Sequence, residues 1–568
     1  MANSTTSEKL TLSCPLFCAE FLTDSLLVVA GGGGAGKSGI PNRISLLDVR
    51  DAPTVLTEID LSRDEDSVMS LGLSRTRDED DYDEKSLESA VILAGINSSM
   101  ASVEDGKNLH FRTFDLTVSP FPTIAARDSI QLFSTPKEQN EIYQRLLRVS
   151  PSGLLWAIGT GGGKANLPGS SEIVLVNARS QQGSGRIHPE GGKEVEDLDI
   201  YSLANGNERL AYCTSSEVFA QDISSTGPGS PKSLYKAPVP ITGSKPEIRN
   251  IRFISSEIIA IIENAPKRTG STLIILEITG ESKVLARKRL PKWIKSINAL
   301  DVTFVSRPQN PPSASENTPK STHLPPIAQY AIALAADTSL TTYLLNIDFT
   351  HGRASLQPHQ TFRNIHPFQV SRVTFGPISA PTDRPQTPTS PTSPSTTRFP
   401  SFSTKPYLPL ASVSVGNTVN IHKFPLLFIP SPDASTDEDE KAPQPGAYYL
   451  RVPGVKRQTF VSVGLSLVLV IVLAIAMQVV FVRRGGLINL NDWSDAVSPM
   501  AGGFSQFGKG EQCDMACADD LVKTVEAVSG IATSDDTVVP VGTVVPEGTV
   551  VPVVLDDSIR IEEVKDEL

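Results

Sequence analysis

Cysteine is scarce in this 568-residue chain, which holds only five: Cys14, Cys18, Cys213, Cys513 and Cys517. So few cysteines cannot form a disulfide framework in a chain of this length. No histidine or further cysteine stands near either cysteine pair at the spacing of zinc ligands, which argues against a zinc site. Cys513 and Cys517 could pair in an oxidising compartment or remain free thiols.

A basic excess is also missing. The formal net charge is −12, and the segment from Gly485 to Leu568 alone holds 16 acidic and 4 basic residues. The rest of the chain is therefore neutral overall. Proteins that bind nucleic acid need clustered Lys and Arg to neutralise phosphates. We accordingly expect no nucleic-acid partner, and we assign the acidity to a C-terminal tail.

One long apolar run stands out from an otherwise mixed sequence. Residues Phe460 to Val482 read FVSVGLSLVLVIVLAIAMQVVFV and carry no charge. A run of 23 such residues is long enough to cross the bilayer as a helix. A buried globular helix is the alternative, but such helices are rarely this long and unbroken. We therefore expect a single transmembrane helix over 460–482.

The two ends of the sequence suggest how that helix is oriented. The N-terminal MANSTTSEKLTLSCPLF has no apolar stretch behind a basic region, so we expect no signal peptide there. The last four residues, Lys565, Asp566, Glu567 and Leu568, spell an ER-retrieval signal that is read by a lumenal receptor. Both observations predict a single-pass type II protein of the ER membrane, with a cytosolic N-terminal part and a lumenal tail.

Helical periodicity is nearly absent from the first 430 residues. Short β-rich runs such as SLLVVAGG, LLWAIGTG and IIAIIENA alternate with turn-rich gaps. The clearest unit runs from Tyr143 to Arg179, and echoes of it begin at Val195, Ile248, Ser296 and His366. Units at a period of about 40 to 60 residues indicate a β-propeller of the WD40 type. These five units and two more within residues 1–140 predict an all-β fold with seven blades, although the Trp-Asp dipeptide itself is missing. A pair of β-sandwiches is the alternative.

Composition divides the chain further. We predict a propeller over 1–430, a linker over 431–459, the membrane helix over 460–482 and an acidic, largely disordered tail over 483–568. Four segments rich in acidic, Gly/Ser or Pro/Ser residues read as mobile surface insertions in the propeller: 63–88, 181–192, 307–326 and 380–406. The Ser-Pro and Thr-Pro steps of the last one could take phosphate or could simply belong to a disordered loop.

A glycine cluster near the N-terminus matches a nucleotide-binding motif. Residues Gly31 to Ser38 match the phosphate-binding pattern G-x-x-x-x-G-K-[ST]. That loop must open a helix, whose N-terminal amides hold the phosphates. Here Gly39-Ile40-Pro41-Asn42 follows, which prevents a helix, and the next run, RISLLDV, reads as a strand. We therefore predict a strand–loop–strand hairpin inside a blade and no ATPase.

The same segment resembles a known family. LLVVAGGGGAGKSGIPNRISLLDV at 26–49 is similar to the ER membrane-anchored guanine-nucleotide exchange factors for the Sar small GTPase, the family of the prolactin regulatory element-binding protein. EVEDLDI at 194–200 and HPFQVSRVTF…LASVSVGNTVNIHKFPL at 366–426 are weaker matches. The long Pro/Ser insertions and the C-terminal KDEL depart from the family pattern but do not touch the glycine segment.

The resemblance implies a seven-bladed cytosolic propeller whose glycine loop, projecting from the first blade, takes part in exchange and is stabilised by a potassium ion. Its candidate residues are Gly31, Gly32, Gly33, Gly34, Gly36, Gly39, Ile40, Pro41 and Asn42. Asn42 matches the asparagine that is important in the family, whereas Lys37 and Ser38 fall on a variable part of the loop. The potassium ligands cannot be assigned from the sequence, and no other cofactor is expected.

An exchange factor makes and breaks no bond, so it needs no catalytic acid, base or nucleophile. It acts by binding the nucleotide-free GTPase better than the loaded one. We therefore expect a GTPase regulator and no enzyme. The loop would wedge against the switch regions of the GTPase while Asn42 supplies hydrogen bonds to it, and the resemblance implies that the loaded GTPase then starts COPII coat assembly. His366 and His422 read as blade residues. The alternative function is an ER-anchored scaffold that docks coat or cargo proteins without exchange activity.

Overall fold

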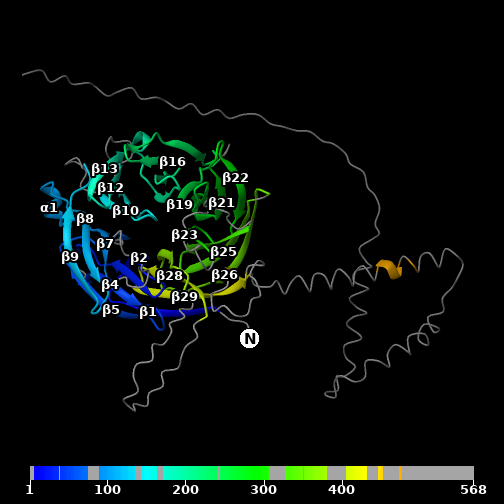
Figure 1. Ribbon diagram of the computed structural model, residues 1–568, viewed down its shortest axis with the longest axis horizontal. Helices are drawn as coiled ribbons and strands as arrows, with labels where there is room; N and C mark the ends of the chain where they lie inside the picture. The colour runs from blue at the N-terminus through cyan, green and yellow to red at the C-terminus, as the bar shows by residue number, and fades with distance from the viewer. Residues whose placement is uncertain are drawn as a thin grey trace, which may run out of the picture. The chain divides into compact units, whose positions relative to one another are not determined.

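The computed structural model describes residues 5–36, 39–74, 89–134, 142–162, 171–239, 243–305, 327–349, 351–379, 405–430, 446–451, 472–475 and 477. The chain divides into two units, Met1–Val455 and Lys456–Leu568. The first unit contains seven antiparallel sheets arranged around a central axis (Figure 1). Each sheet is one blade, which confirms the predicted seven-bladed all-β propeller.

Each of the first three blades has four strands in sequence order from the axis outward. Blade 1 holds β2 (Leu16–Phe21), β3 (Leu26–Gly31), β4 (Asn42–Asp48) and β5 (Thr54–Leu61). Blade 2 holds β6 (Ser70–Ser74), β7 (Ser89–Gly95), β8 (Phe111–Thr117) and β9 (Thr123–Ile130), with the short helix α1 (Met100–Glu104) between β7 and β8. Blade 3 holds β10 (Tyr143–Val149), β11 (Leu155–Gly161), β12 (Ile173–Asn177) and β13 (Gln182–Ile187), followed by the 3₁₀ turn η1 (Glu190–Gly192).

The next three blades repeat this order. Blade 4 holds β14 (Asp197–Ser202), β15 (Glu208–Cys213) and β16 (Glu217–Ser224), with β17 (Gly227–Pro228) and β18 (Lys232–Lys236) both paired to β16 at its outer edge. Blade 5 holds β19 (Glu247–Ser255), β20 (Ile258–Asn264), β21 (Ser271–Glu277) and β22 (Lys283–Arg289), with the 3₁₀ turn η2 (Pro266–Arg268). Blade 6 holds β23 (Ala299–Phe304), β24 (Ile327–Ala336), β25 (Ser339–Asp348) and β26 (Arg353–Phe362).

Blade 7 is closed by the two ends of the propeller sequence. Its inner strands are β27 (Val370–Phe375), β28 (Tyr407–Ser414) and β29 (Thr418–Pro430), and its outer strand is β1 (Thr6–Thr11), which comes from the N-terminus. β1 pairs with β29 from Thr6↔Lys423 to Thr11↔Thr418. A further strand, β30 (Gly446–Leu450), pairs with the far end of β29. The ring is complete because β27 also lies against β2.

Burial follows the position of each strand in its blade. The middle strand β20, for example, is buried from Ile258 to Glu263, whereas the outer strand β22 is exposed at five of its seven residues. A strand covered on both faces needs a continuous apolar run, and an edge strand does not. The large apolar side chains pack between neighbouring blades: Leu93 of blade 2 and Trp156 of blade 3 lie in one such cluster.

Three predicted boundaries are wrong in part. Residues 182–187, expected in a mobile insertion, form β13, and their small side chains serve packing: a Cβ on Gly185 would lie 2.7 Å from Pro228 Cδ of the next blade. Within the expected insertion 63–88, residues 70–74 form β6 because Leu71 fills the core between blades 1 and 2. Within the expected linker 431–459, residues 446–450 form β30.

Tyr448 and Leu450 explain why β30 joins the propeller. Their side chains are 5% and 4% exposed and belong to the core between blades 6 and 7. The backbone N–H of Leu450 also donates to Gln329 Oε1 at 2.7 Å. The propeller unit therefore extends beyond the predicted end at residue 430.

Several predictions lie outside the described residues. These are the insertion at 307–326, the insertion at 380–406 except its last two residues, and the tail 483–568 with its four retrieval-signal residues. Of the apolar segment 460–482, the structure describes 472–475 and 477, which are helical. Across the described parts of the chain, no helix has the length and apolar character that a bilayer crossing requires.

Candidate functional site

The glycine segment connects the second and third strands of blade 1. β3 ends at Gly31, which pairs with Arg43, and β4 begins at Asn42. The predicted strand–loop–strand arrangement is therefore confirmed, and the element that follows the glycines is a strand. A phosphate-binding P-loop needs a helix at that point, so the sequence match at 31–38 is coincidental. Lys37 and Ser38 lie outside the described residues.

Asn42 is fully buried, with an exposed fraction of 0%. Its Nδ2 donates to the backbone oxygens of Ser62 at 3.0 Å and Glu65 at 2.9 Å. Its Oδ1 accepts a hydrogen bond from the N–H of Gly34 at 2.9 Å. A side-chain amide has two donor hydrogens, and both are used here. Asn42 thus fixes the glycine loop to the β5–β6 connection.

This geometry corrects one expectation about Asn42. A side chain that is buried and committed to three backbone groups cannot also supply hydrogen bonds to a GTPase. In this structure Asn42 is a positioning residue.

The glycines at the base of the loop are required by close packing. A Cβ on Gly31 would lie 2.0 Å from the carbonyl oxygen of Pro15, and a Cβ on Gly32 would lie 2.0 Å from Asn42 Oδ1. Gly32 also has a φ of 154° and donates its N–H to Pro15 O at 2.9 Å. Only glycine lets the backbone approach its neighbours this closely.

The rest of the loop becomes progressively exposed. Gly33, Gly34, Ile40 and Pro41 are half-buried, whereas Ala35, Gly36 and Gly39 are exposed. Ile40 packs against the apolar cluster shared by blades 1 and 7. The loop therefore has a fixed base and an exposed tip.

The β5–β6 connection that receives Asn42 is itself held by blade 2. The Glu65 carboxylate pairs with Arg112 at 2.6 Å, and the N–H of Asp66 donates to Asn97 O at 3.1 Å. Sequence reasoning missed this support, because residues 63–66 read only as the start of an acidic insertion. No local pattern reveals that a backbone carbonyl there accepts from an asparagine 23 residues earlier.

Arg43 secures the other side of the loop base. Its guanidinium pairs with Asp60 at 2.6 Å and Glu58 at 2.7 Å, and donates to Ser13 Oγ at 3.0 Å. The hydrogen bond with Arg43 holds the pKa of Asp60 below its usual range. β4 is thereby locked to β5 and to the β1–β2 connection.

His366 and His422 lie in blade 7, as expected. His366 is 3% exposed and its ring nitrogens contact Thr418 Oγ1 at 2.6 Å and Ser412 Oγ at 2.8 Å. His422 Nδ1 lies 2.7 Å from Ser7 Oγ of β1. Burial lowers the pKa of each histidine to about 4. Both are therefore neutral structural groups near pH 7.

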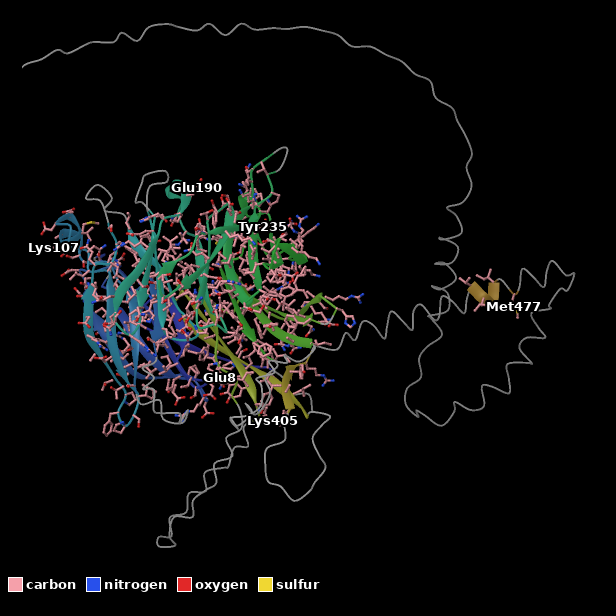
Figure 2. All side chains as sticks on the ribbon, turned by 45° about the horizontal axis from the view of Figure 1, so that its top comes forward. Glu8, Lys107, Glu190, Tyr235, Lys405 and Met477 are labelled. Atoms are coloured by element: carbon pink, nitrogen blue, oxygen red, sulfur yellow. The ribbon has the colours of Figure 1, made fainter. Side chains whose placement is uncertain are left out.

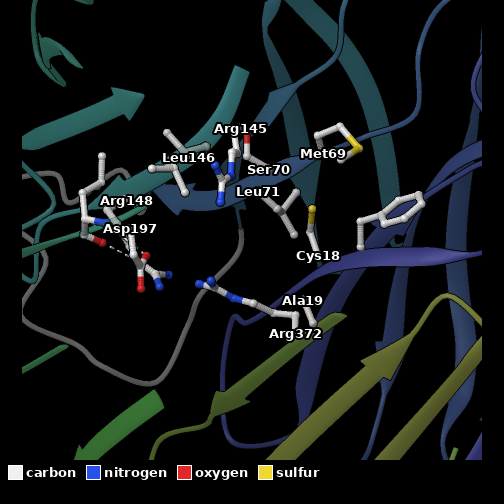
Figure 3. Close-up of a pocket in the computed structure, with 13 residues that line it drawn as sticks. Cys18, Ala19, Met69, Ser70, Leu71, Arg145, Leu146, Arg148, Asp197 and Arg372 are labelled. Atoms are coloured by element: carbon white, nitrogen blue, oxygen red, sulfur yellow. Dashed lines mark hydrogen bonds between the residues drawn. The ribbon is translucent and has the colours of Figure 1, made fainter. Parts of the chain in front are cut away.

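A cavity on the propeller axis is lined by the innermost strands of five blades (Figure 3). Its volume is about 50 Å³, far below that of an ordinary ligand site, so it cannot hold a nucleotide. Arg145, Arg148, Asp197 and Arg372 line it. Burial raises the pKa of Asp197 to about 6 and that of nearby Glu20 to about 7. No cluster of three or more His, Cys, Asp or Glu side chains suited to a metal ion occurs among the described residues.

Two solved structures are similar to this chain at 10% sequence identity. The β-propeller domain of Cps50 (Swd1) from Myceliophteria thermophila has a TM-score of 0.39, with 74% of this chain and 98% of that one covered. Hsv2p from Kluyveromyces lactis has a TM-score of 0.30, with 62% and 99% covered. These scores are low, so the fold assignment rests on the sheet topology. No protein-family profile matches the chain.

Two curated proteins of Candida glabrata are similar in sequence. The guanine nucleotide-exchange factor SEC12 is 23% identical over 376 residues, which are 64% of this chain and 67% of that protein. The putative guanine nucleotide-exchange factor SED4 is 25% identical over 297 residues, which are 51% of this chain but only a quarter, 25%, of that protein. Both relatives are thus guanine nucleotide-exchange factors by name, and the seven-bladed propeller of this chain is consistent with the SEC12 family.

Proposed function

We propose that this protein is a guanine-nucleotide exchange factor that promotes GDP release from a Sar-type small GTPase at the ER membrane, and so starts COPII coat assembly and ER-to-Golgi transport. The names of the two relatives imply a small GTPase as partner. The Sar-type identity of that GTPase is supported by the resemblance of residues 26–49. The protein regulates the GTPase and carries out no bond chemistry itself.

The observation that carries the proposal is the glycine loop, with its exposed tip and fixed base. Ala35 and Gly36 are exposed, while Gly34 is tied to buried Asn42 at 2.9 Å. An exchange factor must bind the nucleotide-free GTPase more tightly than the GDP-bound form, and its effect equals that difference in affinity. A loop held rigidly at its base loses little conformational entropy when its tip inserts beside the nucleotide.

Potassium is the one ion proposed for this site. It takes oxygen ligands, backbone carbonyls among them. The loop contains backbone carbonyl oxygens, and Asp66 Oδ1 lies 3.1 Å from the position that a Cβ on Gly34 would occupy. The donor chemistry fits, with loop carbonyls and the Asp66 carboxylate as the groups that would hold the ion. Bound potassium would supply positive charge that orders the carbonyls of the loop.

The proposed location follows from the sequence. The apolar segment 460–482 would anchor the chain in the ER membrane as a single type II span, with the propeller in the cytosol. Lys565, Asp566, Glu567 and Leu568 would then meet the lumenal retrieval receptor. Anchoring would place the glycine loop where the GTPase must be loaded.

Release of a fluorescent GDP from the Sar-type GTPase tests the proposal. The full chain in detergent should accelerate release at catalytic amounts, and faster in potassium than in sodium buffer. Acceleration that is equal in both buffers would contradict the ion assignment. Binding of the GTPase without faster release would instead establish the alternative, a docking scaffold.

A further inference from the structure

Positive charge is gathered on one side of the propeller rim. The outer strands of three consecutive blades, β18, β22 and β26, contain seven Lys and Arg residues and no Asp or Glu. The outer strands of the other four blades, β1, β5, β9 and β13, contain three basic and four acidic residues. We call β18, β22 and β26 the basic rim. Its charge is notable because the chain as a whole is acidic.

Most of this charge lies in β22 and is exposed, whereas Lys236 of β18 is paired with Glu217 at 3.1 Å. In β22, Lys283, Arg287, Lys288 and Arg289 are all exposed. Arg287 lies 3.9 Å from Glu263, but the other three have no ion-pair partner in the part of the chain that the structure describes. The exposed Lys292 and Lys295 follow directly after the strand. Such a surface attracts anions over roughly a Debye length, about 8 Å at physiological salt.

Contacts join the three strands into one continuous surface. Arg287 of β22 donates to the hydroxyl of Tyr235 in β18 at 2.6 Å, and Lys232 of β18 donates to Gly280 O just before β22 at 2.5 Å. On the other side, β22 lies against β26.

The chain continues beyond the last strand of the propeller next to β26 of the basic rim. β30 ends at Leu450, and the next residue, Arg451, is hydrogen-bonded through its backbone to the ring of His359 in β26. Eight residues, 452–459, then precede the apolar segment 460–482. An extended chain of eight residues spans at most about 29 Å. A membrane that receives this segment would therefore lie within about 29 Å of Arg451, which is beside β26 of the basic rim.

We infer that the basic rim binds the anionic lipid headgroups of the membrane in which the chain is anchored. This inference rests on the proposed membrane anchoring. Clustered Lys and Arg beside a membrane attachment point bind acidic phospholipids by electrostatic attraction. Contact at the rim would hold the propeller in one orientation and keep the glycine loop accessible from the cytosol. An acidic segment of this chain could also cover the rim, and the test below separates that occupant from lipid.

The test uses the full chain with phosphatidylcholine vesicles and with vesicles that also contain phosphatidylserine. Flotation reports anchoring, and acetylation of lysines by a water-soluble reagent, read by mass spectrometry, reports contact. We expect Lys283, Lys288, Lys292 and Lys295 to be labelled several-fold less on the anionic vesicles, and this protection to be lost in high salt. Lys107 and Lys193, on blades 2 and 3–4, should be labelled equally on both. Figure 2 shows Lys107 far from Tyr235 of the rim.

Matched variants give the decisive comparison. K283E/K288E should restore the labelling of Lys292 and Lys295 on anionic vesicles, whereas K107E/K193E, with the same change of net charge, should not. Equal protection on both vesicle types would overturn the inference and indicate an acidic segment of the chain as occupant. Flotation only with anionic vesicles, lost in K283E/K288E, would support rim binding while contradicting the proposed anchoring. Unchanged GDP release by both variants in detergent would show that the rim acts separately from exchange.

Discussion

Asn42 Oδ1 accepts a hydrogen bond from the N–H of Gly34 at 2.9 Å, which joins the first residue of β4 to the base of the glycine loop. The same side chain donates to Ser62 O and Glu65 O. The loop and the β5–β6 connection are therefore one unit, held from inside the protein. The effect of changing Asn42 should thus appear in stability as well as in exchange.

Asn42→Ala should lower the free energy of unfolding by on the order of 3 kcal/mol, because it leaves buried backbone groups of three residues without partners. It should also slow GDP release, since the loop tip loses its fixed base. Thermal unfolding and nucleotide release of the full chain measure the two effects. Asn42→Asp is the matched control: it keeps the acceptor for Gly34 but loses the donor hydrogens, and it should also be destabilised. Unchanged unfolding in Asn42→Ala would contradict the positioning role.

Two glycine substitutions separate the base of the loop from its tip. Gly32→Ala should destabilise the protein and slow exchange, because the new Cβ would lie 2.0 Å from Asn42 Oδ1. Gly36→Ala should leave the melting temperature unchanged, since its Cβ would meet nothing closer than Gly33 O at 3.8 Å. Equal destabilisation by both substitutions would show that the loop has no fixed base.

Truncation of the chain before β30 should show how much this strand contributes to the stability of the propeller. A chain that ends at residue 430 loses the buried side chains of Tyr448 and Leu450, whereas one that ends at residue 455 keeps them. Burying a large apolar side chain contributes about 1.5–3 kcal/mol, so the shorter chain should unfold at a clearly lower temperature. Identical melting curves would indicate that β30 does not stabilise the propeller.

Buried Glu20 should make the stability of the folded protein depend on pH. Burial raises its pKa from 4.5 to about 7 in the folded protein, opposed by Arg148. The folded state therefore binds more protons than the unfolded state between these values, and this group's contribution to stability falls as pH rises from about 4.5 to 7. Glu20→Gln removes that dependence, so the variant should gain stability relative to the parent as pH rises. Denaturant unfolding at pH 5 and pH 8 measures the difference, and a constant difference would contradict the raised pKa.

Much of the fold could be read from the sequence because blade strands leave a strong local signal. The middle strands β11 and β20 are continuous apolar runs, as strands buried on both faces must be. Short edge strands carry no such signal. β13 consists largely of Gly, Ser and Gln, and β1 of polar residues, so their pairing depends on tertiary contacts alone.

In the glycine loop, too, local sequence predicts the backbone conformation but does not predict the long-range contacts. The strand–loop–strand conformation of Gly31 to Asn42 could be predicted, because Gly39 and Pro41 exclude a helix. The inward orientation of the Asn42 side chain could not be predicted. Its partners, Ser62 and Glu65, lie about twenty residues away in a segment that composition alone marks as a loop. Long-range hydrogen bonds to backbone carbonyls have no residue code in a single sequence.

The most direct test of the account is the rate of GDP release from the Sar-type GTPase with the full chain and with its Ala35→Glu variant, which alters the exposed tip and leaves the buried base intact. We predict that the parent chain accelerates release at catalytic amounts, and that the variant loses this acceleration while its melting temperature is unchanged. Undiminished release by a folded Ala35→Glu variant, or no acceleration by the parent, would contradict a role of the glycine loop in exchange.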